Sequence, residues 1–363
     1  MKIAMIGHKR VPSREGGVEI VVEQLSIRMA SLGNDVTLFN RKRKEYKKID
    51  AYKGCKVKEV FSINKKSLDA LVYSFFATVK AKHGHFDIVH FHAEGPCAFL
   101  WTLGRKHKKF KVVVTIHGLD WQRGKWGGFA TKFLKYCERQ AVKHADKIIV
   151  LSENNKNYFK NTYNRETEYI PNGIDKPIFK EPNIITKEFG LTKDSYVLFL
   201  ARIVPEKGLH YLIEVWKRIE NKKGLKLVIA GGSSHTSEYF NEIVSMTKGD
   251  STIIMTGFVQ GDKLYELYSN AYLYVLPSDI EGMPMSLLEA MSYGNSCLVS
   301  NIPENLEIIN DQCVSFEKGN CDSLFEKLNN IINNTEVFKE TKTNLKNWDI
   351  VTRDTLKLYQ QVL

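Results

Sequence analysis

The sequence predicts an α/β protein made of two doubly wound domains. Short apolar runs alternate with helical patterns as far as about residue 173, and the alternation starts again at about residue 195. Strands and helices at this spacing indicate βαβ units, and therefore parallel sheets that are covered by helices on both faces. The length of 363 residues points the same way, because a single hydrophobic core rarely grows that large.

The predicted elements follow one another in order along both halves. Strands are predicted at residues 2–7, 35–40, 86–92, 111–118, 147–152 and 167–173, with helices at 19–33 and 128–144. In the second half, strands are predicted at 195–202, 226–232, 252–258, 271–278 and 296–301, with helices at 208–220 and 347–363. We therefore expect a first domain at 1–172, a turn-rich linker at 173–183, a second domain at 184–346 and a final helix at 347–363. Ligands of such sheets bind beyond the carboxyl ends of the strands, so a cleft between the domains is the expected site.

The composition is that of an ordinary globular protein, with 43% hydrophobic and 26% charged residues. No run approaches about 18 consecutive apolar residues, and the start MKIAMIGHKR lacks the long apolar region of a signal peptide. The six cysteines are scattered without a CxxC pair, which argues for reduced thiols and against a disulfide framework or a zinc site. We therefore expect a cytoplasmic protein.

The net charge of +12 is unevenly distributed. Residues 1–180 contain 35 Lys and Arg against 17 Asp and Glu, whereas residues 181–363 contain 18 against 24. A basic half suggests an anionic partner such as nucleic acid, anionic lipid headgroups or a phosphorylated acceptor. The runs 41–48 and 105–111, with the aromatic and lysine-bearing segment 68–82, suit a peripheral protein on an anionic membrane surface. The plainer alternatives are charge for solubility alone and an ordinary core helix at 68–82.

The segment EGMPMSLLE (281–289) carries two glutamates around a predicted helix start. Pro284 suits the beginning of a helix, and the free N–H groups of residues 285–287 would favour an anion such as phosphate. Glu281 and Glu289 could then contact different parts of one ligand. The alternative is an acidic loop residue followed by a solvated helix glutamate.

A second anion-binding corner is predicted at the same edge of the second sheet. In LFLARIVPEKGLHYL, Arg202 follows a strand and Lys207 precedes a helix. An arginine can grip phosphate oxygens in bidentate fashion, and a lysine supplies a point charge. Alone, each would be an ordinary solvated cation. Together with the helix start at 284–289 they predict a diphosphate site.

These motifs resemble the carboxyl-terminal domain of the retaining family 4 glycosyltransferases, which have the GT-B fold: two Rossmann-like domains facing across a cleft. The resemblance lies in ARIVPEKGLHYLI, VIAGG, TGFV and SDIEGMPMSLLEAMSYGN, where Glu281 and Glu289 match the family's E-x7-E element. It implies that Arg202 and Lys207 neutralise the donor's diphosphate, that Glu289 binds the ribose and that Glu281 faces the sugar. It further implies donor-binding roles for Gly16, Gly17, Asn172, Gly231, Gly232, Gly257, Met285, Ser286 and Leu287.

The amino-terminal half resembles the family's bacterial polysaccharide branch, especially its rhamnosyltransferase-like members. The matching segments are VPSREGGVEIVVEQLSIRMASLGNDVTLFNR and VVVTIHGLDWQRGKWGGF. The resemblance makes His117 the family's cleft histidine, which contacts the donor sugar near the reacting centre. It places Asp120, Trp121, Arg123 and Lys125 on the acceptor side. Two departures stand out: EGMPM replaces the commoner EGFGLP, and no role carries over to residues 8–10.

The resemblance implies a hexosyltransferase-type enzyme that needs no cofactor. The donor would be a nucleoside-diphosphate sugar, and the acceptor a glycan or a polyprenyl-diphosphate-linked glycan in the synthesis of capsule, exopolysaccharide or O-antigen. No D-x-D metal motif occurs, so we expect no metal and a leaving group stabilised by cations and helix ends. The alternatives are a nucleotide-sugar epimerase of the same fold and, in another class, a nucleic-acid-binding protein. No nucleic-acid recognition motif accompanies the basic runs, so we expect no nucleic-acid partner.

Overall fold

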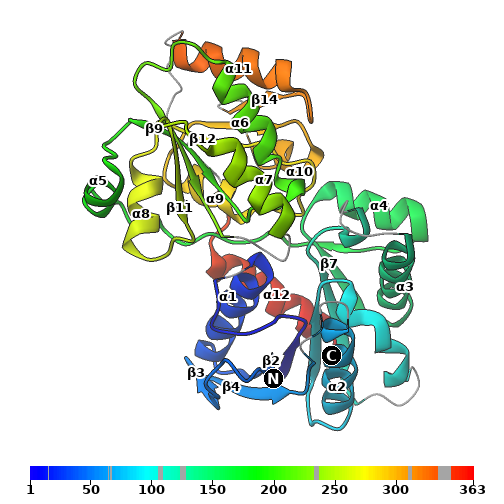
Figure 1. Ribbon diagram of the computed structural model, residues 1–363. Coiled ribbons are helices and arrows are strands. Elements are labelled where there is room, and N and C mark those ends of the chain that lie inside the picture. Colours follow the sequence, from blue (N-terminus) through cyan, green and yellow to red (C-terminus); the bar gives the residue numbers. More distant parts are fainter. Residues whose placement is uncertain are drawn as a thin grey trace. The chain divides into compact units, whose positions relative to one another are not determined.

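The computed structural model describes residues 1–14, 16–63, 65, 68–104, 109–122, 128–232, 237–309, 313–333 and 345–363. The chain divides into two compact units (Figure 1). Unit 1 comprises Met1–Gly173 and Lys346–Leu363, and unit 2 comprises Ile174–Leu345. Each unit holds one sheet with helices around it, so the predicted α/β class with two doubly wound domains is confirmed. Among the described helices, none has the length and hydropathy needed to cross a bilayer.

Unit 1 contains an eight-stranded sheet in the order β3-β4-β2-β1-β5-β6-β7-β8. Its strands are β1 (Lys2–Ile6), β2 (Asp35–Arg41), β3 (Ala51–Tyr52), β4 (Cys55–Val60), β5 (Ile88–His92), β6 (Lys111–Ile116), β7 (Lys147–Val150) and β8 (Glu168–Tyr169). The pairs are parallel except for the β3–β4 hairpin. The strand order reverses at β1, whose Ile3 pairs with Val36 on one side and with Ile88 on the other. A ligand site is expected at such a reversal.

The helices of unit 1 cover both faces of this sheet. They are α1 (Gly17–Ser31), α2 (Asp69–Lys82), η1 (Gly95–Leu103), η2 (Asp120–Gln122), α3 (Gly128–His144), α4 (Glu153–Tyr163) and α12 (Trp348–Val362). Helices α2, η1, α3 and α4 bury apolar side chains in one core, whereas α12 lies beside α1. Arg28 of α1 pairs with Asp349 of α12 through Nε and Oδ1, 2.9 Å apart. The chain's last helix is thereby fixed to its first.

Unit 2 contains a six-stranded parallel sheet in the order β11-β10-β9-β12-β13-β14. Its strands are β9 (Tyr196–Leu200), β10 (Lys226–Ala230), β11 (Ile253–Gly257), β12 (Leu273–Leu276), β13 (Cys297–Ser300) and β14 (Val314–Phe316). The helices are α5 (Ile184–Phe189), η3 (Pro205–Lys207), α6 (Leu209–Arg218), α7 (Ser237–Thr247), α8 (Asp262–Ser269), α9 (Met285–Ser292), α10 (Pro303–Leu306) and α11 (Cys321–Asn333). This is the strand order of dinucleotide-binding folds, and it reverses between β9 and β12.

Three strands lie where none was expected: β3, β4 and β14. In β4, the sequence CKVKEV alternates buried Cys55 and Val57 with exposed Lys56 and Lys58. Half of its positions are charged, so it lacks the apolar run that marks the central strands. Strand β14 has only three residues, which is too short to show a period.

Candidate functional site

The site in unit 2 lies where its strand order reverses, at the carboxyl ends of β9 and β12. Lys207 ends the short turn η3 after β9, and Glu281 lies in the loop after β12. Gly208 holds the two loops together: its φ is +65°, and a Cβ there would lie 2.0 Å from the carbonyl oxygen of Pro277. Only glycine allows the backbones of these two loops to come this close. The backbone therefore places Lys207 beside the loop that carries Glu281.

Lys207 and Glu281 form a partly buried ion pair. The Lys207 Nζ lies 2.5 Å from Glu281 Oε1, and the two side chains are 13% and 7% exposed. Ser278 Oγ donates to the same carboxylate oxygen over 2.7 Å. The two residues predicted to hold the diphosphate and the sugar thus orient each other. A ligand's phosphate would share the ammonium group with Glu281.

Helix α9 begins directly after Pro284. Pro284 is the N-cap, with φ −71° and ψ 105°, and Met285 is the first helical residue. The N–H of Leu287 already donates to the Pro284 carbonyl oxygen, 3.1 Å away. The prediction of three available amides is therefore wrong for Leu287. Met285 and Ser286 remain as the first-turn amides that a helix cannot satisfy internally.

Glu289 is oriented by a buried tyrosine. The hydroxyl of Tyr268 donates to Glu289 Oε2 over 2.8 Å, and Tyr268 itself is 1% exposed. Burial raises the pKa of Tyr268 well above its usual value, with the Glu289 carboxylate adding to the shift. The phenol therefore stays protonated and keeps donating. One face of the carboxylate is fixed by the protein, as a residue that binds ribose hydroxyls would require.

The three glycines predicted to approach the nucleotide have different surroundings. A Cβ on Gly231 would lie 1.9 Å from the Ala201 carbonyl oxygen, so packing inside the sheet explains this glycine without any ligand. On Gly232 a Cβ would make an ordinary 3.6 Å contact with Phe258. Gly257 has φ +70° and open space around it. Arg202, which follows β9, is half-buried.

The site in unit 1 lies at the corresponding reversal, between β1 and β5. Gly7 follows β1 with φ +119°, and a Cβ there would lie 2.2 Å from the His92 carbonyl oxygen. Gly16 is the N-cap of α1 and Gly17 its first residue, as the glycine pair suggests. The buried Glu19 carboxylate already faces this helix start: its Oε1 accepts from the Lys9 N–H over 3.0 Å. A ligand's phosphate would meet that carboxylate there, which the sequence interpretation did not anticipate.

His117 follows β6 and belongs to a row of histidines that the sequence interpretation missed. Its Nε2 lies 3.0 Å from Nδ1 of the buried His92, which stacks on His90 with ring centroids 4.1 Å apart. His90 contacts the Tyr359 hydroxyl through Nδ1 at 2.6 Å and the Thr115 hydroxyl through Nε2 at 2.7 Å. The signal was present in the sequence as HFH, two residues apart on one face of a strand.

This row is uncharged and sets the tautomer of His117. Burial lowers the pKa of His90 to about 3 and that of His92 well below its usual value. The His92 Nε2 has no hydrogen-bond partner among the described residues. Since a buried orphan N–H is rarer than a buried orphan acceptor, we place the His92 proton on Nδ1, where it is donated to His117. His117 then carries its own proton on Nδ1.

The structure describes some of the residues that were predicted to lie on the acceptor side. Asp120 begins η2, and Trp121 donates from its indole Nε1 to Glu138 Oε2 over 3.0 Å. The Lys135 ammonium lies 4.2 Å from the centre of the Trp121 ring. Arg123 and Lys125 lie outside the described residues. Asn172 is buried, with 6% exposure, at the end of the first stretch of unit 1.

Glu94 is a further residue that the sequence interpretation missed. It follows β5 and is fully buried, and its carboxyl group lies beside Asp120 and Glu138. Burial, followed by the charges of Asp120 and Glu138, raises its pKa to about 11. Glu94 is therefore a neutral carboxylic acid beside Asp120 and Glu138. An acidic residue directly after an apolar strand was the signal that could have found it.

In the described part of the chain, no three His, Cys, Asp or Glu side chains are arranged to hold a metal ion.

Two family profiles match the chain. The profile described as Glycosyltransferase Family 4 matches residues 15–176, and that described as Glycosyl transferases group 1 matches residues 181–348. Together they account for nearly the whole chain. The protein belongs to the family 4-type glycosyltransferases of GT-B fold.

Individual relatives agree with this assignment. An Escherichia coli UDP-Gal:alpha-D-GlcNAc-diphosphoundecaprenol alpha-1,3-galactosyltransferase is 27% identical over 265 residues, 68% of this chain and 66% of that protein. The sucrose-phosphate synthase of Thermosynechococcus elongatus has a similar structure, with a TM-score of 0.84 at 19% identity over 99% of this chain and 98% of the other. HepE of Anabaena in complex with UDP-glucose superposes with a TM-score of 0.73 at 16% identity, covering 100% and 98%.

Proposed function

We propose that the protein transfers a sugar from a nucleoside-diphosphate sugar to a glycan acceptor with retention of configuration, as a hexosyltransferase-type enzyme. The observation that carries this is the cluster of Lys207, Glu281 and Ser278 at the strand reversal of unit 2. It combines a cation for phosphate with an oriented carboxylate for sugar hydroxyls, in the place where such sheets bind ligands. The UDP-glucose complex of HepE supports a donor of this kind.

The residues then divide the work as follows. Arg202, Lys207 and the first-turn amides of α9 stabilise the diphosphate as the bond between the sugar's anomeric carbon and the phosphate oxygen breaks. Glu289 binds the ribose and Glu281 the sugar. The acceptor hydroxyl forms the new bond from the same face, and its proton passes to the departing phosphate oxygen. His117 offers its Nδ1–H to the donor sugar.

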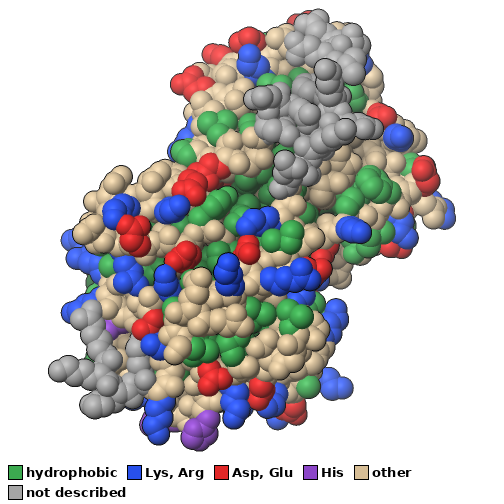
Figure 2. All heavy atoms as spheres, turned by 180° about the vertical axis from the view of Figure 1, so that it is seen from behind, with side chains coloured by type: hydrophobic (Ala, Val, Ile, Leu, Met, Phe, Trp, Pro, Cys, Tyr) green, Lys and Arg blue, Asp and Glu red, His purple; other side chains and the backbone are tan. Residues whose placement is uncertain are grey.

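The acceptor proposed here is a lipid-linked glycan of a surface polysaccharide, used at the inner face of the cytoplasmic membrane. The diphosphoundecaprenol acceptor named for the Escherichia coli relative supports this class of molecule. The basic amino-terminal half suits an anionic surface. On the face drawn in Figure 2, Lys and Arg are dispersed among hydrophobic and acidic side chains and do not gather into one stripe. The rhamnosyltransferase-like branch and the absence of a metal requirement stay predictions.

Calorimetric titration with UDP, GDP, dTDP and ADP, with and without EDTA, tests the donor site. We expect one nucleotide to bind best, and Arg202→Ala and Glu289→Ala to abolish that preference. Lys263→Ala is the matched control, because Lys263 forms a surface ion pair with Glu188 in the same unit. The sugar product is then identified by NMR. No binding of any nucleotide would contradict the proposal, and an epimerised sugar nucleotide without transfer would favour the epimerase.

A further inference from the structure

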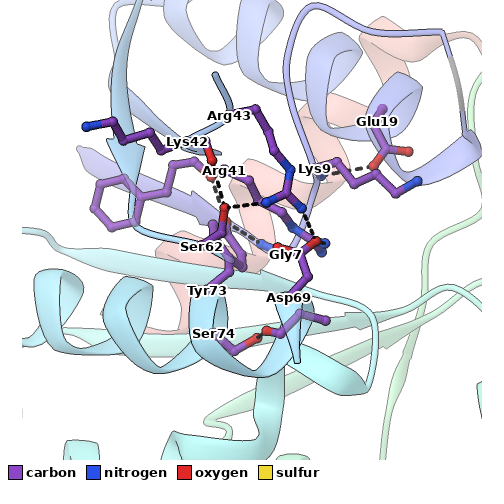
Figure 3. Close-up of polar contacts among 12 residues, drawn as sticks. Gly7, Lys9, Glu19, Arg41, Lys42, Arg43, Ser62, Asp69, Tyr73 and Ser74 are labelled. Atoms are coloured by element: carbon purple, nitrogen blue, oxygen red, sulfur yellow. Dashed lines mark hydrogen bonds and ion pairs between the residues drawn. The ribbon is translucent and has the colours of Figure 1, made fainter. Parts of the chain in front are cut away.

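Two arginines converge on one carboxylate at the carboxyl end of β2 in unit 1 (Figure 3). Arg41 Nη1 lies 2.7 Å and Arg43 Nη2 lies 2.5 Å from the same oxygen, Oδ2 of Asp69, which begins α2. The guanidinium of Arg41 also lies over the ring of Tyr73, 5.0 Å from its centre. The three charged side chains are 12%, 15% and 14% exposed. This cluster is thus half-buried and touches solvent.

Within this cluster positive charges outnumber negative ones, although the Glu19 carboxylate also acts on the neighbouring Tyr73 and His8. Two guanidinium groups share one carboxylate, and neighbouring His8 is neutral because burial lowers its pKa to about 4. Arg41 Nε and Asp69 Oδ1 are buried and have no hydrogen-bond partner among the described residues. A half-buried cation with unused donors is costly unless an anion compensates it. Bidentate arginines are the side chains best suited to phosphate oxygens.

A row of exposed phenylalanines begins beside this cluster. Phe61 contacts Phe76, Phe76 contacts Phe75, and Phe75 contacts Phe99, with ring centroids 5.3, 5.4 and 5.3 Å apart. Phe61 is 52% exposed, Phe75 41% and Phe76 39%. Such a run of large apolar side chains on the surface usually marks a contact site. Lys80 and Lys82, both exposed, lie on the same helix as Phe75 and Phe76.

The arginines and the aromatic row are parts of one surface. Arg43 Nη1 donates to Ser62 Oγ over 3.1 Å, and Ser62 directly follows Phe61 (Figure 3). Asp69 lies on α2, the helix that also carries Phe75 and Phe76. A charged cluster that continues into an apolar strip fits a molecule with a phosphate at one end and hydrocarbon at the other.

We propose that Arg41 and Arg43 bind the phosphate head of a phosphorylated lipid, whose hydrocarbon chain lies along Phe61, Phe76, Phe75 and Phe99. The proposal rests on the proposed function, since it locates the carrier end of a lipid-linked acceptor on unit 1. Asp69 holds the arginines in place when the site is empty and competes with the phosphate. The arginines therefore recognise the phosphate head group, and the row of phenylalanines binds the hydrocarbon chain.

Vesicle co-sedimentation tests the proposal. Neutral phosphatidylcholine vesicles containing a long-chain polyprenyl diphosphate are compared with phosphatidylglycerol vesicles of equal surface charge. We expect the protein to prefer the polyprenyl diphosphate, and Arg43→Gln to weaken that binding about ten- to a hundredfold. Asp69→Asn should have the opposite effect and strengthen it. The double substitution of Phe75 and Phe76 by Ser should reduce binding to both kinds of vesicle.

Two controls separate the possible outcomes. Leu32→Ser removes an equally exposed apolar side chain, 55% exposed at the end of α1, and should leave binding unchanged. Nucleotide binding by unit 2, measured calorimetrically, should stay normal in every variant, so that failure here does not reflect failure of the donor site. Equal binding to phosphatidylglycerol vesicles, or inorganic diphosphate competing as well as the lipid, would overturn the proposal. So would weaker binding by Asp69→Asn, because Asp69 would then be part of the site.

Discussion

The two strand reversals of this protein are built from opposite chemistry. In unit 2 the reversal between β9 and β12 carries an ion pair, Lys207 and Glu281, whose side chains are 13% and 7% exposed. In unit 1 the reversal between β1 and β5 carries the buried neutral histidines His90 and His92 and the protonated acid Glu94. The same topology therefore holds an ion pair in unit 2, whereas in unit 1 it holds buried neutral groups next to one carboxylate, that of Glu19.

The difference fits the two tasks of a sugar transfer. A diphosphate is negatively charged, so its site must supply positive charge. A charged side chain costs less free energy where water still reaches it, because it is then not fully desolvated. Orienting sugar hydroxyls requires fixed donors and acceptors, and buried neutral groups are fixed by their neighbours. If this division is right, substitutions in unit 2 should affect the binding of charge, and those in unit 1 should affect pH dependence and orientation.

The largest effect is expected from Lys207→Ala. It removes the cation next to the proposed leaving diphosphate and leaves the half-buried Glu281 carboxylate without its ion pair. We expect kcat/KM to fall about 10²–10³-fold, comparable to loss of one transition-state donor. Steady-state kinetics measure this, with Lys263→Ala as the control. A change in KM alone would show that Lys207 binds the ground state and the transition state equally.

Glu94→Gln should change how stability depends on pH. Burial raises the pKa of Glu94 from 4.5 to about 11, so the folded state keeps this proton over a wider pH range than the unfolded state does. The bound proton therefore stabilises the folded state fully below pH 4.5, and this stabilisation is lost as pH rises toward 11. Between pH 5 and 8 the wild type should therefore lose about 2–4 kcal/mol of unfolding free energy that the glutamine variant does not lose. Urea unfolding at both pH values measures this. Parallel pH profiles for the two proteins would show that Glu94 ionises normally.

Neighbouring glycines in unit 2 give a matched pair. Gly231→Ala would place a Cβ 1.9 Å from the Ala201 carbonyl oxygen, whereas Gly232→Ala makes an ordinary contact at 3.6 Å. We expect the first to lower the unfolding free energy by about 1–3 kcal/mol and the second to leave it nearly unchanged. Thermal unfolding with and without nucleotide separates the two roles. Loss of nucleotide binding in Gly232→Ala, without loss of stability, would show that the ligand approaches Gly232.

The smallest effect is expected from His92→Phe, which keeps the ring but removes the hydrogen bond to His117. His117 then no longer has a fixed tautomer, so kcat should fall about tenfold with little change in KM. Tyr359→Phe, which removes only the hydroxyl that contacts His90, is the milder comparison. An unchanged kcat would reduce His92 to a packing role.

The sequence allowed the fold to be predicted, and it let the residues proposed for the charged site of unit 2 be named because short motifs carry them. Arg202 and Lys207 are five residues apart, and Glu281 and Glu289 are eight apart, so short motifs contain them. The site of unit 1 joins His92, His117 and Glu94 from two strands and a following loop, and its chemistry depends on burial. A short motif predicts neither the register between two strands nor a pKa that burial has shifted. The occupied Leu287 amide likewise depended on backbone angles.

Gly173 and Trp348 have a further consequence. A Cβ on Gly173 would lie 2.7 Å from the backbone of Trp348, so the chain leaves unit 1 and returns to it at one spot. Topologically, unit 2 is an insertion between two neighbouring points of unit 1. A short bridge from Gly173 to Trp348 should therefore excise unit 2 and leave a continuous, closed unit 1. Such a truncated chain would allow the folding and the ligands of unit 1 to be studied in the absence of unit 2.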